Sequence, residues 1–253
     1  MAILETHHLS RRYGSLVALD DLNLKVEAGE CFGFIGPNGA GKTTTIKILA
    51  TLLKPSSGEA RVCGFTVGWQ NTHIRPLIGY VPDFLGAYDD MLVREYLQFF
   101  ASCYGITGSR RTQVVDDALS LTDLGGKAEA PISGLSRGMS QRLAVARVLL
   151  HDPEVLLLDE PASGLDPRAR VEMRELLRTL RDLGKTILIS SHILHELAEL
   201  CTSVGILERG KLVFAGSVQS ALDAARSGTR LECELDGGMD AALGLLGSLD
   251  GVR

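Results

Sequence analysis

The sequence has no long apolar run, no basic tract and no basic leader, and each absence excludes a class of protein. Its apolar runs, such as residues 155–158, are far shorter than the roughly 20 residues that cross a bilayer. Residues 1–6 lack a basic start and a long apolar stretch, so we expect no signal peptide and no transmembrane segment. The net charge of −5 gives no sign of nucleic-acid binding. We therefore expect a cytoplasmic protein that another chain holds at any membrane.

The cysteines are odd in number and scattered: Cys31, Cys63, Cys103, Cys201 and Cys233. None of them forms a Cys-x-x-Cys pair or lies near histidines at zinc spacing. This pattern favours buried small hydrophobic side chains in a reducing compartment. Hydrophobic residues make up 45% of the chain and charged residues 23%, which is the balance of an ordinary globular protein with its own core.

Apolar strands and amphipathic helices alternate along the chain, without an internal repeat or a heptad run. The expected strands lie at residues 19–26, 31–35, 59–65, 77–81, 155–158, 186–190, 204–207 and 211–214. The expected helices lie at residues 43–53, 93–104, 113–121, 137–150, 168–183 and 193–200. This alternation predicts an α/β fold with a largely parallel sheet covered on both faces. Beyond residue 227, a strand at 231–235 and a helix at 239–246 are expected to begin a small accessory lobe.

A phosphate-binding pattern, G-x-x-x-x-G-K-[ST], lies between an expected strand and an expected helix. It consists of Gly36, Pro37, Asn38, Gly39, Ala40, Gly41, Lys42 and Thr43, and Thr44 follows it. Glycines let the backbone bend until its N–H groups converge on phosphates, and the following helix directs its positive end at the same anion. Lys42 adds a full charge, and the Thr43 hydroxyl is placed to bind Mg²⁺. We predict a nucleoside triphosphate site, although the loop does not name the reaction.

Two carboxylates, Asp159 and Glu160, follow the apolar run at residues 155–158. A buried parallel strand places its carboxyl end at the crevice where ligands bind. Asp159 is therefore expected to share Mg²⁺ with Thr43, and Glu160 to polarise or deprotonate the attacking water. The alternative is a pair of solvated acids at a surface strand end, which the nearby phosphate loop makes less favourable.

The segment Leu135-Ser136-Arg137-Gly138-Met139-Ser140-Gln141-Arg142 resembles the signature of ATP-binding cassette proteins, usually Leu-Ser-Gly-Gly-Gln. It departs from that form at Arg137 and Met139 but keeps Ser136 and Gly138. Ser136 is expected to cap a helix that begins here. Taken alone, the segment is also explained as a capped helix without a ligand.

Other motifs resemble the same family and occur in the family's order. Tyr13 stands where cassette proteins place an aromatic ring against adenine. Residues 163–166, ending at Asp166, resemble the D-loop that bridges two subunits. His192 follows the expected strand at 186–190 and resembles the switch histidine that contacts the γ-phosphate.

Residues 78–83 resemble the family's Q-loop, but Asp83 stands where glutamine is usual. An aspartate is also a hard oxygen ligand for Mg²⁺, and it adds negative charge near the phosphates. The resemblance covers residues 3–217 and rests on six ordered motifs.

The resemblance implies a P-loop NTPase core of the RecA-like type, an N-terminal antiparallel β lobe and an inserted α-helical lobe at about residues 84–150. The nucleotide-binding domain would span residues 1–217, and residues 218–253 would form a C-terminal extension. Two such subunits pack head to tail, so that Ser136 and Gly138 of one cover the ATP held by the other. The resemblance assigns the base to Glu160, the γ-phosphate contacts to His192 and Lys42, and Mg²⁺ to Thr43, Asp159 and Asp83.

The function that this resemblance implies is ATP hydrolysis by a transporter subunit at the cytoplasmic face of the membrane. Its partners would be a separate membrane permease and a second nucleotide-binding subunit, either a copy or a homologue, and the signature variant favours export. Residues 84–96 are expected to contact the permease or, alternatively, to fill the helical lobe's own core. The competing hypotheses are a soluble cassette acting on ribosomes or DNA, a regulator that binds ATP without hydrolysis, and a P-loop kinase.

Overall fold

The computed structural model describes residues 2–84, 86 and 90–226. Contacts between Cα atoms divide the chain into two compact units, residues 1–221 and 222–253. The predicted boundary after residue 217 stays a prediction, and the strand and helix expected after residue 227 lie outside the described residues. No helix within the described ranges has both the length and the apolar character needed to cross a membrane.

Four strands near the N-terminus form an antiparallel sheet in the order β2-β1-β4-β5. They are β1 (Ala2–Tyr13), β2 (Leu16–Glu27), β4 (Ser57–Val62) and β5 (Phe65–Thr66). Leu4, Leu22 and Val26 are fully buried, while charged residues such as Lys25 face solvent. This alternation is what an antiparallel sheet with one packed face requires. The sheet is the N-terminal β lobe that the resemblance implies.

The second sheet has six strands in the order β10-β9-β3-β8-β7-β6. They are β3 (Cys31–Ile35), β6 (Ile78–Val81), β7 (Val155–Leu158), β8 (Thr186–Ser191), β9 (Ser203–Glu208) and β10 (Lys211–Ser217). All neighbouring pairs are parallel except β9 and β10. Every residue of β3, β7 and β8 is buried, as expected for central strands covered on both faces. The carboxyl ends of these three strands carry the phosphate loop, Asp159 and His192.

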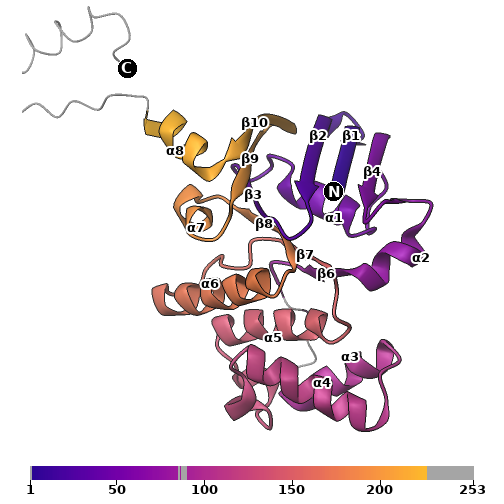
Figure 1. Ribbon diagram of the computed structural model, residues 1–253, viewed down its shortest axis with the longest axis vertical. Helices are drawn as coiled ribbons and strands as arrows, with labels where there is room; N and C mark the ends of the chain where they lie inside the picture. The colour runs from indigo at the N-terminus through magenta and orange to yellow at the C-terminus, as the bar shows by residue number, and fades with distance from the viewer. Residues whose placement is uncertain (1, 85, 87–89, 227–253) are drawn as a thin grey trace, which may run out of the picture. The chain divides into compact units, whose positions relative to one another are not determined.

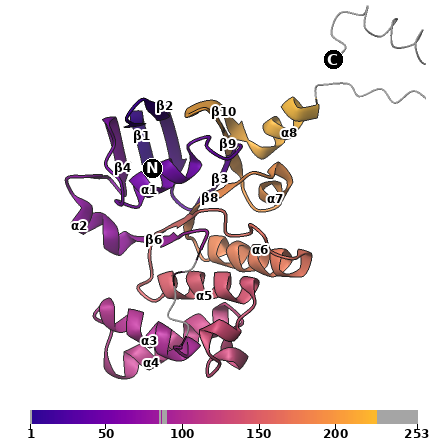
Figure 2. The ribbon, with the colours of Figure 1, turned by 180° about the vertical axis from the view of Figure 1, so that it is seen from behind.

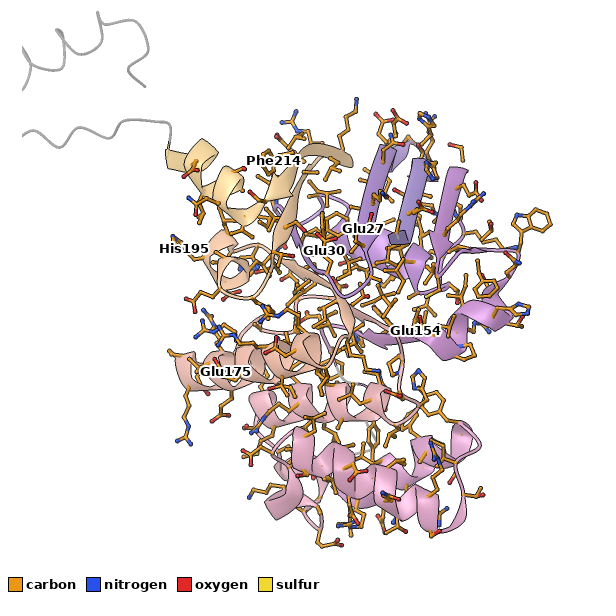
Figure 3. All side chains as sticks on the ribbon, in the orientation of Figure 1. Glu27, Glu30, Glu154, Glu175, His195 and Phe214 are labelled. Atoms are coloured by element: carbon orange, nitrogen blue, oxygen red, sulfur yellow. The ribbon has the colours of Figure 1, made fainter. Side chains whose placement is uncertain are left out.

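A tight turn joins the two sheets between β2 and β3. The Glu30 N–H donates to the carbonyl of Glu27 (3.2 Å), and the Glu27 N–H donates to the Glu30 carboxylate (2.8 Å). Figure 3 labels both residues at this corner. The other oxygen of the Glu30 carboxylate accepts a hydrogen bond from Ser203, the first residue of β9. The turn therefore fixes the start of β3, and with it the position of the phosphate loop.

The helices are α1 (Lys42–Leu49), α2 (Asn71–Ile74), α3 (Val93–Cys103), α4 (Gly108–Leu121), α5 (Arg137–Leu149), α6 (Pro167–Asp182), α7 (Leu194–Ala198) and α8 (Val218–Arg226). Single 3-10 turns lie at Arg75–Leu77, Gly125–Lys127 and Ile132–Gly134. In Figures 1 and 2, α3, α4 and α5 lie together at the end of the unit away from β1, β2 and β4. They form the predicted helical lobe.

Two predicted helix ends are corrected by the structure. The helix expected over 43–53 ends at Leu49, because Thr51 adopts a left-handed backbone (φ 62°) and the Leu52 N–H donates to the carbonyl of Lys47 (2.9 Å). This pattern closes a helix at its C-terminus. The helix expected over 113–121 begins at Gly108, since the extended backbone of Thr107 ends the preceding loop there.

The aromatic residues expected to contact a permease divide between the two readings. Tyr96 is fully buried in the helical lobe, so it belongs to the core. Phe84 is 82% exposed, which leaves it free for such a contact, and Phe99, which lies outside the predicted segment 84–96, is 47% exposed. Leu85 and Tyr88 lie outside the described residues. The prediction for the cysteines is also mixed: Cys31 and Cys201 are buried, but Cys103 is exposed at the end of α3.

Candidate active site

The phosphate loop leaves β3 at Ile35 and enters α1 at Lys42. Two of its glycines have no room for a side chain. A Cβ on Gly36 would lie 2.3 Å from the Leu207 carbonyl oxygen, and one on Gly41, where φ is 109°, would lie 2.8 Å from that of Ala18. At these two positions the loop backbone packs directly against the backbone of neighbouring segments, and only glycine permits so close an approach.

Lys42 is almost completely buried, and its ammonium group lies inside the loop. Its Nζ donates to the carbonyls of Gly36 (2.6 Å) and Pro37 (3.2 Å), and it lies 3.2 Å from Glu160 Oε1. A buried charge needs such partners. The arrangement places one cation between the loop and the carboxylate at the end of β7.

A cavity of about 240 Å³ opens at the phosphate loop. Among the described residues it is lined by Tyr13, Leu16, Val17, Ala18, Glu160 and residues 37–44. Tyr13 is 43% exposed, and the Arg11 guanidinium lies 4.6 Å from its ring centroid. The ring predicted to meet adenine thus lies beside the predicted phosphate site. Ser136, Gly138 and Asp166 are not among these lining residues.

The metal ligands predicted on two separate segments lie together. Thr43 Oγ1 donates to Asp159 Oδ1 (3.0 Å), and Ser190 Oγ donates to the same oxygen (2.9 Å). A hydroxyl and a carboxylate are hard oxygen ligands and fit Mg²⁺, which keeps several water or phosphate ligands of its own. Burial raises the pKa of the Tyr80 phenol in β6 to about 12, and the negative charge of Asp159 adds to this effect. The described residues hold no cluster of three or more acidic, histidine or cysteine side chains around a metal position.

Glu160 has a strained backbone conformation and contacts two other predicted site residues. Its φ is 49°, a region that non-glycine residues rarely occupy and that tends to occur at functional sites. Its N–H donates to Ser190 Oγ (2.9 Å), which holds the strained turn in place. Its carboxylate contacts Lys42 through Oε1 (3.2 Å) and His192 Nδ1 through Oε2 (3.2 Å). The structure therefore brings Lys42, Glu160 and His192 together.

The signature and the D-loop each begin a helix. Ser136 Oγ accepts from the Met139 N–H (3.3 Å) and caps α5, as predicted, and Asp166 caps α6 by accepting from the Ala169 N–H (2.9 Å). A Cβ on Gly138 would lie 2.7 Å from the Ala169 Cβ, so this glycine allows α5 to approach α6 closely. The signature and the D-loop are thus packed against each other within one chain.

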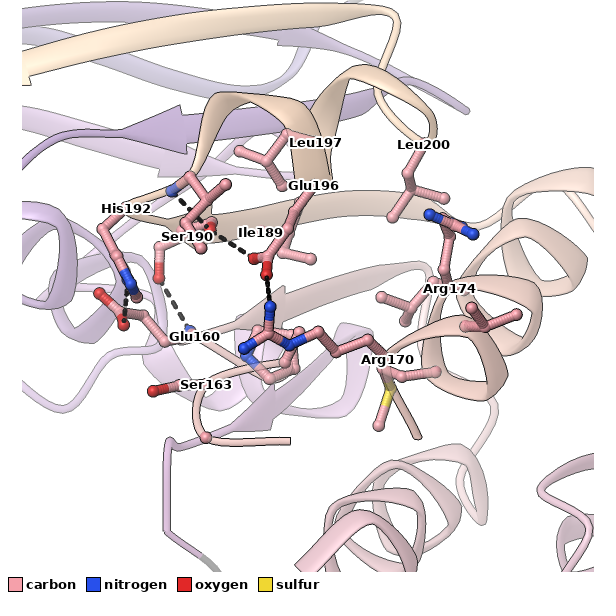
Figure 4. A pocket seen from close by; sticks show the side chains of 18 of the residues that line it. Glu160, Ser163, Arg170, Arg174, Ile189, Ser190, His192, Glu196, Leu197 and Leu200 are labelled. Carbon is pink, nitrogen blue, oxygen red and sulfur yellow. Dashed lines mark hydrogen bonds and ion pairs between the residues drawn. The ribbon is translucent and has the colours of Figure 1, made fainter. Parts of the chain in front are cut away.

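Figure 4 shows a second cavity, of about 420 Å³, beside the D-loop, α6 and α7. A chain of polar contacts crosses it. Arg170 Nε donates to the Leu165 carbonyl of the D-loop (3.0 Å), and its guanidinium lies 3.1 Å from Glu196 Oε1. Ser191 Oγ donates to Glu196 Oε2 (3.0 Å) and accepts from the Ile193 N–H (3.0 Å). The D-loop is therefore connected to both residues that flank His192.

Arg170 and Glu196 were not among the predicted site residues. Each lies four residues after a predicted one, Asp166 and His192, within a helical segment. From the sequence alone, a charged residue at that spacing on an amphipathic helix is expected on the face exposed to solvent. The contact between them is made across 26 residues of sequence and has no local signal.

We expect Glu196→Ala to lower kcat for ATP hydrolysis about tenfold and to leave KM for ATP within about twofold, because Glu196 holds Ser191, the residue before His192, and does not line the phosphate cavity. Steady-state kinetics measure both constants. The matched control is Glu199→Ala, which removes a carboxylate from the same segment that pairs with Arg174 instead. A kcat equal in the two variants would contradict a role for the Arg170–Glu196 contact.

Residues 19–163, more than half of the chain, match the ABC transporter family. The chain belongs to this family. It is 40% identical over 224 residues to the Nod factor export ATP-binding protein I of Burkholderia pseudomallei (strain 1710b), and the match covers 88% of this chain and 74% of that protein. The protein of the same name from Paraburkholderia xenovorans (strain LB400) is 40% identical over 227 residues, 90% of this chain and 74% of that protein.

Solved structures agree with this membership. The cbiO1 structure from Clostridium perfringens, described as part of the ABC transporter complex cbiONQ, matches with a TM-score of 0.82 and 28% identity over 89% of this chain and 92% of that one. An ATP-binding cassette in a dimeric, post-hydrolysis state with ADP and Pi matches in fold, with a TM-score of 0.77 and 24% identity over 85% of this chain and 98% of that one.

The predicted fold, function and enzyme class are confirmed by these matches. The protein is an ATP-binding subunit of an ABC transporter, and its activity is ATP hydrolysis. This result favours the transporter reading over the soluble cassette and the regulator without hydrolysis. The roles assigned to individual residues stay predictions.

Proposed function

We propose that this subunit hydrolyses Mg²⁺-ATP in a composite site made with a second nucleotide-binding subunit, and that closing and opening of this pair drives export through a separate permease. The observation that supports the composite site is the division of the motifs. One chain supplies the phosphate loop and Glu160 around one cavity, with His192 in contact with Glu160, while Ser136 and Gly138 neither line that cavity nor contact Glu160 among the described residues. A head-to-tail pair would bring the signature of each subunit to the other's nucleotide, giving two symmetric sites.

The chemistry of this site follows from the contacts of Glu160. Its carboxylate lies between Lys42 and His192, at 3.2 Å from each. Nucleotide phosphates would replace Glu160 as the ion-pair partner of Lys42. The Glu160 carboxylate would then be free to accept a proton from water. The water oxygen then bonds to the γ-phosphorus, and the bond from that phosphorus to the bridging oxygen breaks. His192 and Lys42 stabilise charge on the transferred group.

The proposed metal ligands are Thr43 and Asp159, which are already 3.0 Å apart. Mg²⁺ held there would supply positive charge that offsets the negative charge of the phosphates. Asp83, the third predicted ligand, has Arg137 as its charged neighbour (3.6 Å). Its contact with the metal stays a prediction.

The proposed partners are a permease at the cytoplasmic face of the membrane and a second subunit that is either a copy of this chain or a homologue. The names of the relatives, export ATP-binding proteins, support export as the direction. The complex to which cbiO1 belongs supports assembly with other transporter chains. The exposed aromatics Phe84 and Phe99 are candidates for contact with the permease, because large exposed apolar side chains often mark interfaces.

Dimerisation driven by ATP tests this proposal. In static light scattering with Mg²⁺-ATP, we expect the Glu160→Gln variant to double its mass from 27.2 kDa, because ATP is bound and not consumed. The control is the same variant carrying Lys42→Ala, which should stay monomeric. A Glu160→Gln variant that binds ATP and remains a monomer at all concentrations would contradict a composite site made by this chain with its own copy.

A further inference from the structure

Asp83 and Arg137 are the two charged residues at which this chain departs from the family's usual motifs, and the structure brings them together. Arg137 Nη2 lies 3.6 Å from Asp83 Oδ1. Asp83 follows β6, and Arg137 begins α5, so the contact joins segments 54 residues apart. Both side chains are 56% exposed. The two departures therefore compensate each other in charge.

A second contact ties the same two segments. Gln141, one helical turn after Arg137, donates from Nε2 to the backbone carbonyl of Asp83 (2.6 Å). Gln141 is only 3% exposed, so this bond is part of the packed interior. It places the Asp83 carboxylate beside the first turn of α5, within reach of Arg137.

Arg137 also lies over the D-loop. A Cβ built on Gly164 would be 2.8 Å from Arg137 Cζ, closer than real Cβ contacts come, and 3.0 Å from Nη1. Gly164 moreover has φ 65°, a conformation that favours glycine. The guanidinium thus occupies the space that a side chain at position 164 would need.

We propose that Asp83 and Arg137 form a clasp that joins the segment after β6, the signature and the D-loop, and that positions the signature for the second subunit. The clasp rests on the composite site proposed above. Either charge alone would be unbalanced at a surface that must approach nucleotide phosphates: an unpaired aspartate repels them, and an unpaired arginine has no fixed direction. Paired, the two act as positioning residues, neither of them a base or a phosphate ligand.

Charge reversal tests the clasp in the Glu160→Gln background. We expect Asp83→Arg and Arg137→Glu each to weaken ATP-dependent dimerisation about fivefold, since loss of a half-exposed ion pair and its replacement by repulsion have an effect of this order. The double variant, which restores an opposite pair, should return to within about twofold of the background. Salt near 1 M should remove the differences in dimerisation because it screens exposed charges.

The matched control is Arg94→Glu, which reverses an arginine of the helical lobe paired with Asp116 (2.6 Å) and Glu129 (2.8 Å), away from the three joined segments. It should not change dimerisation. A readout independent of dimerisation is hydrogen exchange of the monomer at residues 160–166, which should be faster in each single reversal and restored in the double variant.

The clasp would be overturned if the double variant dimerised no more tightly, and exchanged no more slowly at residues 160–166, than the more impaired of the two single variants. If the Glu160→Gln background itself does not dimerise but exchange is restored in the double variant, the clasp stands as a contact within one chain and the composite site made by this chain with its own copy is wrong. The two proposals therefore fail in different measurements.

Discussion

Replacing Lys42 by alanine is expected to weaken ATP binding at least about 100-fold. The ammonium group is buried, donates to two loop carbonyls and pairs with Glu160. Truncating one partner of a buried, hydrogen-bonded charge pair costs about 2–5 kcal/mol, and Lys42 is predicted to form such a pair with the nucleotide phosphates. Titration with a fluorescent ATP analogue or by calorimetry measures the dissociation constant directly.

The control for this prediction is Lys47→Ala, which removes a basic residue from the last turn of the same helix, α1. It should bind ATP within about twofold of the native protein, because charges at a helix C-terminus change stability rather than anion binding at the N-terminus. If Lys42→Ala bound ATP with nearly native affinity, the phosphate-loop assignment would be wrong. Circular dichroism should be recorded for both variants, so that a loss of folding is not taken for a loss of binding.

The parallel strands and the loops at their carboxyl ends were predictable because they depend on local patterns. A run such as residues 155–158 is apolar on both faces only when it is central in a sheet, and the structure buries all four of its residues. The phosphate loop needs glycines at fixed spacing, and its neighbours Leu207 and Ala18 explain why. The end of α1 was placed too late since Thr51, which is not a glycine, adopts the left-handed turn.

The polar contacts between distant segments were not predictable from one sequence. Asp83 and Arg137 each stood out as a departure from a motif, but no local rule states that residues so far apart in sequence meet. Likewise, Arg170 and Glu196 read as exposed charges on two helices, and only the packing of α6 near α7 turns them into a connection between the D-loop and His192. Motifs therefore identify which residues do chemistry, whereas tertiary packing decides which residues hold them in position.

Replacing Glu160 by glutamine is expected to lower kcat for ATP hydrolysis between about 100-fold and 10,000-fold, the range associated with loss of a general base. Glutamine has almost the same size and keeps an oxygen within reach of Lys42, so ATP binding should stay within about threefold of native. Phosphate release measured under steady state, together with the binding titration, separates the two effects. Such a variant is expected to lose turnover and to keep its affinity for ATP.

The matched control is Glu154→Gln, since Glu154 immediately precedes β7 and lies at the opposite end of that strand from Glu160. The same chemical change there should leave kcat within about twofold, because only the carboxyl ends of the parallel strands meet the ligand crevice. A Glu160→Gln variant with more than about a tenth of native kcat would show that another group accepts the proton. His192, 3.2 Å from the Glu160 carboxylate, is the neighbour whose substitution would then have to abolish the remaining rate.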